Sequence, residues 1–332
     1  MQHAAEESGA ARAMYALCTL TGCTGVQSAL DPQSPGAQRI ADLFWVMTIG
    51  GGIIYVAFVG LSLYAMYARR EQHSQLFARR LIIGGAVVVP TVLLAALLIH
   101  GLQMLPLQLA PAPQGSLRIH VSGEQWWWRI RYHPPDGPSF ETANEIRLPV
   151  DTPVQFELES PDVIHSFWVP NLAGKVDMIP GRMTRLALTA ARVGDYRGVC
   201  AEYCGTSHAW MAFPVVVLDR RAFSEWLADQ TVAPSAPVDP LLRQGHSAFM
   251  ENGCGACHTV RGTAAQGVIG PDLTHVGSRG TIGAGLFARN ESTLARWIAS
   301  TDQVKPGVHM PSFGMLSTPT LHALAAYLES LK

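Results

Sequence analysis

Two long uncharged apolar runs limit what this chain can fold into. Residues 43–67 and 81–105 each extend for 25 residues without Asp, Glu, Lys or Arg. A helix of that length spans roughly 37 Å, which is enough to cross the roughly 30 Å of hydrocarbon in a bilayer. A buried helix of a soluble protein is the alternative, and two such runs in tandem disfavour it. The sequence therefore predicts a transmembrane helical hairpin over residues 43–105.

The charges between the two runs predict which way the hairpin crosses the membrane. The connector carries one acidic residue and four arginines: Glu71, Arg69, Arg70, Arg79 and Arg80. Positive charge marks the cytoplasmic side of a membrane protein. We therefore expect the turn to lie inside, and the N-terminus and everything after residue 106 to lie outside.

Residues 1–42, which precede the hairpin, are small, polar and turn-rich. Within them, the run Leu20-Thr21-Gly22-Cys23 resembles the cleavage site of a bacterial lipoprotein. The run predicts lipidation at Cys23. The alternative is a tail in which the thiols are incidental.

The part after the hairpin changes character twice. Residues 117–220 contain alternating segments such as Leu117–Val121, separated by Pro and Gly, which predicts a β-sandwich or barrel. Residues 229–240 are rich in Pro and Ala and predict a linker. Residues 241–332 have helical periodicity and predict a small all-α domain. The net charge of −1 gives no basic excess, so nucleic acid is not an expected partner.

A dense group of metal-binding residue types lies in the predicted β domain. Residues 200–211 read CAEYCGTSHAWM and hold two thiols, an imidazole and a thioether. Such soft ligands select copper over hard cations. Structural zinc and a Cys200–Cys204 disulfide are the two competing interpretations. The disulfide would leave His208 and Met211 without a purpose.

The spacing of this loop, Cys-x-Glu-x-Cys-x3-His-x2-Met, resembles the binuclear copper loop of cytochrome c oxidase subunit II. The earlier DVIHSFW run with His165, the GEQWWW run with Trp126 and the segment 170–182 also resemble that family. The resemblance covers residues 43–220 and implies a cupredoxin-like fold for residues 117–220.

The resemblance also implies a role for each matching residue. Cys200 and Cys204 would bridge two copper ions, and His165 and His208 would bind one copper each. Met211 would be a weak ligand to the copper that His165 holds. The backbone carbonyl of Glu202 would bind the other copper weakly, and its carboxylate would face a magnesium site shared with subunit I. Trp126 matches the aromatic residue near which electrons reach the copper.

A second redox motif lies in the C-terminal domain. Cys254-Gly-Ala-Cys257-His258 is the attachment motif of c-type haem, and a redox C-x-x-C is the alternative. Residues 240–332 resemble small class I c-type cytochromes. The resemblance implies covalent attachment at both cysteines, His258 as one axial ligand and Met310 as the other. His309 and Met315 are the alternative sixth ligands.

Together these parts resemble subunit II of a haem–copper cytochrome c oxidase with a fused cytochrome c domain. The resemblance implies a chain of the bacterial inner membrane, with its copper and haem domains on the periplasmic face. Subunit I, a third subunit and an external cytochrome c or other high-potential donor would be its partners. Oxygen would be reduced to water in subunit I, coupled to proton translocation. The alternative function is the electron-accepting subunit of a nitric oxide reductase.

Overall fold

The computed structural model describes residues 24–67 and 74–332, which form two separately folded units. The prediction of lipidation at Cys23 falls outside the described residues. Residues 38–110 form a helical unit, and the remaining described residues form the unit that holds both soluble domains. Each unit is described by itself.

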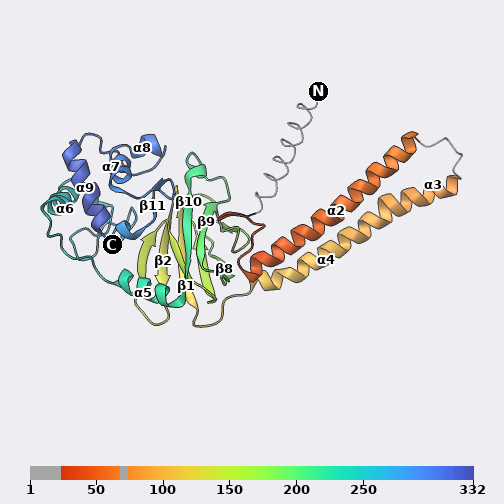
Figure 1. Ribbon diagram of the computed structural model, residues 1–332, viewed down its shortest axis with the longest axis horizontal. Coiled ribbons are helices and arrows are strands. Elements are labelled where there is room, and N and C mark those ends of the chain that lie inside the picture. The colour runs from red at the N-terminus through yellow and green to blue at the C-terminus, as the bar shows by residue number, and fades with distance from the viewer. Residues whose placement is uncertain (1–23, 68–73) are drawn as a thin grey trace, which may run out of the picture. The chain divides into compact units, whose positions relative to one another are not determined.

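The helical unit contains two helices that are long and apolar enough to cross a membrane. Helix α2 spans Pro35–Tyr67 and begins before the predicted position at residue 43. The second span, Gln75–Leu109, consists of α3 (Gln75–Ile82), the π-helical turn η1 (Ile83–Val88) and α4 (Val89–Leu109). Pro90 follows η1 and lacks the N–H that a regular helix needs, which accounts for the local change in hydrogen bonding. Figure 1 shows the two spans running in opposite directions.

The β domain consists of two five-stranded sheets, as predicted for residues 117–220. The strand orders are β3-β2-β1-β5-β8 and β4-β10-β9-β6-β7. Pairs β1–β5 and β4–β10 are parallel, and the other pairs are antiparallel. The strands are Leu117–Glu124, Trp127–His133, Phe140–Ala143, Ile146–Pro149, Val154–Glu159, His165–Trp168, Val176–Met178, Thr184–Leu188, Gly194–Cys200 and Ala212–Leu218.

The core of the β domain is aromatic and complete. Trp128, Phe156, Phe167 and Phe213 are each at most 1% exposed. The ring of Trp128 lies edge-on to Phe167 and Phe213, with centroids 5.9 and 4.9 Å away. This packing fixes strands β6, β9 and β10, whose ends carry the predicted copper ligands.

The C-terminal domain is built from four α-helices: α6 (Pro240–Glu251), α7 (Glu291–Ala299), α8 (Thr301–Val304) and α9 (Thr318–Ser330). Helices α6 and α9 cross at Gly245, where a Cβ would lie 2.0 Å from the carbonyl oxygen of Ala323. A glycine is therefore required at this crossing. The irregular part includes the 3₁₀ turns η3 (Cys254–Ala256) and η4 (Val276–Ser278) and the short pair β11 (Thr281–Ile282) and β12 (Phe287–Ala288).

The segment between the domains is partly helical. Helix α5 spans Arg220–Thr231, so it occupies the first residues of the predicted linker at 229–240. The side chain of Gln230 is buried, and its carbonyl oxygen accepts a hydrogen bond of 2.7 Å from Arg261 of the C-terminal domain. Pro and Ala composition predicted a free linker, but these contacts hold its beginning in the fold.

Candidate metal centre and haem cavity

The ends of three strands hold the predicted copper loop in place. Phe167 of β6 pairs with Cys200, the last residue of β9, which brings His165 beside the loop. The Cys200 amide donates to the carbonyl oxygen of Met211 (2.9 Å) and so closes the loop. The Ala201 amide donates to the carbonyl oxygen of Ser166, also at 2.9 Å. Backbone hydrogen bonds thus position the ligands.

All the residues predicted to bind copper converge. The Cys200 and Cys204 sulfur atoms are 3.8 Å apart. His165 Nδ1 lies 3.8 Å from Cys200 Sγ, and His208 Nδ1 lies 3.5 Å from Cys204 Sγ. Met211 Sδ is 3.8 Å from Cys204 Sγ, and the carbonyl oxygen of Glu202 is 3.2 Å from Cys200 Sγ.

This geometry separates the competing interpretations. A disulfide requires sulfur atoms about 2.05 Å apart, whereas Cys200 and Cys204 are free thiols. The ligand nitrogen of His165 and both sulfur atoms lie within 4.8 Å of one another, close enough to hold a metal ion. The thioether of Met211 and the Glu202 carbonyl add donors beyond the four of a structural zinc site. The donor set therefore fits copper better than a structural zinc ion.

The site is buried and favours a thiolate. His165, Cys200 and Cys204 are 0%, 6% and 3% exposed. Hydrogen bonding with Cys204 lowers the pKa of Cys200 to about 3, while the same contact raises the pKa of Cys204. The two sulfur atoms therefore share one proton, and a bound metal would take the place of that proton.

Asp162 is a functional residue that the sequence reasoning missed. Its Oδ1 lies 2.9 Å from His165 Nε2, which leaves Nδ1 directed toward the sulfur atoms. Its other oxygen accepts from the Gln125 amide at 2.7 Å. Burial raises the pKa of Asp162, but hydrogen bonds from Gln125, Val163 and His165 outweigh it and lower the pKa. Carboxylates commonly orient ligand histidines in this way, so the three-residue spacing to His165 was the available signal.

The Trp126 side chain is buried against the predicted copper loop, whereas the Glu202 side chain is exposed. Trp126 is 6% exposed, and its Nε1 donates to the carbonyl oxygen of Cys204 at 3.0 Å. The Glu202 side chain is 45% exposed, and its carboxylate is 3.8 Å from Lys175 Nζ. The indole is therefore in direct contact with the thiol loop, whereas the carboxylate faces outward.

The second redox motif lines a cavity of 490 Å³ that residues of both the C-terminal domain and the β domain border. Cys254, Cys257 and His258 border it together with apolar side chains of the domain core. His258 Nδ1 donates to the carbonyl oxygen of Pro271 at 2.8 Å, so Nε2 is left for a metal. A Cβ at Gly270 would lie 2.5 Å from the His258 ring, so only glycine permits this placement. Burial lowers the pKa of His258, which favours the neutral ligand form.

The cavity distinguishes the candidate sixth ligands. Met310 borders the cavity and packs against the apolar core. His309 also borders it but has an exposed side chain, and Met315 is 78% exposed. Arg279 is 6% exposed, and its Nε lacks a hydrogen-bond partner. Because Arg279 also borders the cavity, this orphaned donor fits a carboxylate-bearing group such as haem.

A chain with two membrane-length helices, a thiolate metal site in a cupredoxin-like domain and a c-type haem motif is a membrane electron-transfer protein. The model of the periplasmic domain of cytochrome c oxidase subunit II matches residues 133–219, and that of cytochrome c matches residues 242–332. A cytochrome c oxidase subunit 2 of Alkalihalophilus pseudofirmus is 34% identical over 328 residues, covering 94% of each chain. The chain belongs to the cytochrome c oxidase subunit 2 family.

Two further comparisons cover less of the chain. The subunit 2 of Bacillus subtilis is 33% identical over 66% of this chain and 63% of its own length. The crystal structure of the periplasmic domain of subunit II of cytochrome oxidase from Bradyrhizobium japonicum is 30% identical. It covers 36% of this chain and 96% of its own, with a TM-score of 0.33. The predicted family and the predicted three-part fold class are confirmed.

Proposed function

We propose that this chain is the electron-accepting subunit of a cytochrome c oxidase. Electrons pass from an external donor through the C-terminal domain and the copper loop to subunit I, where oxygen is reduced to water with proton translocation. The observation that carries the proposal is the convergence of His165, Cys200, Cys204 and His208 in a buried cluster. A purely structural loop has no need of that donor set.

In this proposal the copper loop holds two ions. Cys200 and Cys204 would supply thiolates to both ions, and His165 and His208 would bind one each. Met211 and the Glu202 carbonyl would be weak ligands to the His165 and His208 coppers, respectively. The bound pair supplies one-electron exchange with little change in geometry. The chain's part is to keep the ligands still, which the hydrogen bonds of the Cys200 and Ala201 amides do. Trp126, whose indole N–H donates a hydrogen bond to the carbonyl oxygen of Cys204, is the residue near which electrons reach the loop.

The C-terminal domain holds one haem c. Cys254 and Cys257 would attach it covalently, and His258 and Met310 would bind the iron. A methionine ligand raises the potential, which suits a donor to copper. The chain contributes the His258 orientation through Pro271 and the apolar walls of the cavity.

The remaining roles follow from the same assignment. Both soluble domains lie on the periplasmic side of a bacterial inner membrane, crossed by the two long helices. Subunit I and a third subunit surround the hairpin, and the outward carboxylate of Glu202 contributes to a magnesium site with subunit I. Cys23 carries the lipid.

Metal analysis and turnover of the purified complex test this function. We expect at least two copper ions for each covalently bound haem, and oxygen uptake when a reduced high-potential donor is supplied. Consumption of nitric oxide without oxygen uptake would assign the chain to a reductase instead. Intact metals with neither activity would overturn the proposal.

A further inference from the structure

Lys305 of the C-terminal domain is buried against the β domain, which carries the predicted copper loop and is called the copper domain below. Its side chain is 1% exposed, although lysine is among the residues least often buried. Its Nζ donates to the carbonyl oxygens of Trp126 (2.7 Å), Trp210 (2.8 Å) and Gly283 (2.7 Å). An ammonium has three N–H donors, so all are satisfied. Two of the acceptors belong to the β domain, so these three hydrogen bonds form together only when the two domains are in contact.

Burying this ammonium costs free energy that its hydrogen bonds must offset. Burial lowers the pKa of Lys305 to about 7, because desolvation penalises the ammonium. Among the described residues no carboxylate forms an ion pair with it. The three carbonyl oxygens therefore provide its hydrogen bonds, and the charge of Cys204 adds a smaller favourable interaction. A neutral amine with two donors would leave one carbonyl oxygen unpaired.

The two residues after Lys305 also contact the copper loop. The carbonyl oxygen of Pro306 accepts a hydrogen bond of 2.6 Å from the Ser207 hydroxyl. Gly307 has φ +84°, and a Cβ there would lie 2.7 Å from the Trp126 ring. The backbone thus packs directly on the indole. Residues 305–307 lead to Met310 on one side and contact Trp126 on the other.

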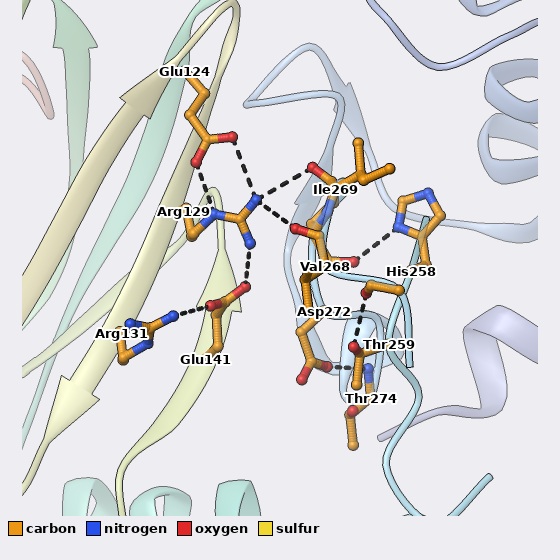
Figure 2. A network of polar contacts seen from close by, with 12 residues as sticks. Glu124, Arg129, Arg131, Glu141, His258, Thr259, Val268, Ile269, Asp272 and Thr274 are labelled. Atoms are coloured by element: carbon orange, nitrogen blue, oxygen red, sulfur yellow. Dashed lines mark hydrogen bonds and ion pairs between the residues drawn. The ribbon is translucent and has the colours of Figure 1, made fainter. Parts of the chain in front are cut away.

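A second contact reaches the other side of the haem cavity. Arg129 Nη2 donates to the carbonyl oxygens of Val268 (3.0 Å) and Ile269 (3.2 Å), as Figure 2 shows. Its guanidinium is held by Glu124 and Glu141, each at 2.7 Å. The segment that Arg129 binds continues into Gly270 and Pro271, which orient His258. Both axial-ligand segments are therefore tied to the copper domain.

We propose that Lys305 is a positioning residue that holds the C-terminal domain in one docked arrangement, with Trp126 between the haem cavity and the copper loop. This inference rests on the proposed function and adds how electron transfer inside the chain is kept in register. Lys305 binds neither metal, so its effect is on the arrangement of the two centres. Loss of the ammonium leaves buried carbonyl oxygens unpaired and lowers the docked population.

The test compares Lys305→Met with Lys332→Met, an exposed lysine of the same domain, in the purified oxidase complex. The first readout is the rate of electron transfer from haem to copper after flash reduction of the haem by a ruthenium complex. The second is the distribution of haem-to-copper distances from pulsed electron paramagnetic resonance. For Lys305→Met we expect a rate at least about tenfold lower and a broadened distance distribution, with unchanged spectra of both centres. Lys332→Met should match the native complex.

Each outcome bears on the inference separately from the function. A native rate and a native distance distribution in a fully metallated Lys305→Met complex would overturn the inference. If that variant fails to assemble, Lys305→Gln, which keeps two N–H donors, should show an intermediate loss. A native complex without any haem-to-copper transfer would instead overturn the proposed function.

Discussion

At the copper loop the predicted ligands already touch one another, whereas at the haem cavity they face a space of 490 Å³. The predicted copper ligands lie at the ends of strands whose aromatic core is filled by the strands' own side chains. The predicted haem iron ligands, His258 and Met310, come from distant parts of the C-terminal domain and border the cavity.

The difference teaches that the two cofactors contribute differently to stability. Copper would be bound by a scaffold that stands by itself, because the sheets supply their own hydrophobic core. Haem would be part of the core it occupies, because an empty apolar cavity costs the domain packing contacts. Removing the two groups should therefore have unequal consequences.

The largest expected effect follows from preventing haem attachment. In the double variant Cys254→Ala and Cys257→Ala, we expect loss of covalent haem and unfolding of the C-terminal domain, because its core is left unfilled. Limited proteolysis should cut within residues 241–332 while the β domain stays intact. Haem staining of denaturing gels and proteolysis of the complex measure both parts.

Copper removal is the matched control for that variant. Chelation should leave the proteolysis pattern of both domains native, since the strands pack without metal. A C-terminal domain that resists protease without haem would contradict the distinction between the two regions.

The second effect is confined to the copper loop. Cys204→Ser replaces a thiolate by a hydroxyl that does not bridge copper, so the binuclear spectrum should disappear. Donor-driven turnover should fall by at least ~100-fold, because loss of a residue that only hydrogen-bonds to a metal ligand can already cost that much. Ala209→Ser adds a hydroxyl at an exposed position of the same loop and should behave as native. A retained mixed-valence copper signal in Cys204→Ser would show that the thiols do not both bridge.

The third effect concerns the sixth haem ligand. Met310→Ala should change the haem spectrum and lower its potential by on the order of 0.1 V, within the ~0.8 V that axial ligands set. His309→Ala should leave both unchanged, because that side chain is exposed. Redox titration followed by optical absorption measures the shift. The reverse result would make His309 the ligand.

The two regions were also unequally readable from sequence. The predicted copper loop is contiguous over residues 200–211, so the spacing of the motif named its candidate ligands. The structure brings these side chains together with His165. The sixth haem ligand required a choice among Met310, His309 and Met315, which only burial and the position of the cavity address. Local spacing reports residues on one loop, but not which distant side chain faces a cavity.

Contacts between the domains were not predictable at all. The Pro- and Ala-rich composition of residues 229–240 predicted a linker and no contact between the domains, yet Lys305 and Arg129 bind backbone carbonyls across the interface. A carbonyl acceptor has no residue signature, so no motif marks such a bond. The same reason hid Arg261, whose partner is the carbonyl of Gln230.

The smallest expected effect sharpens the view that the copper scaffold is preorganised. Asp162→Asn keeps an acceptor for the Gln125 amide but removes the charge beside His165, so copper affinity should fall about tenfold with the fold unchanged. The pKa of Asp162 is lowered, so its charge is complete above its usual value near ~4 and is lost only as the pH falls further. The native copper spectrum should therefore be constant from about pH 8 to about pH 4 and change below it, whereas Asp162→Asn should show its altered spectrum throughout. Equal spectra and affinities for the two proteins would mean that the sheet alone orients His165.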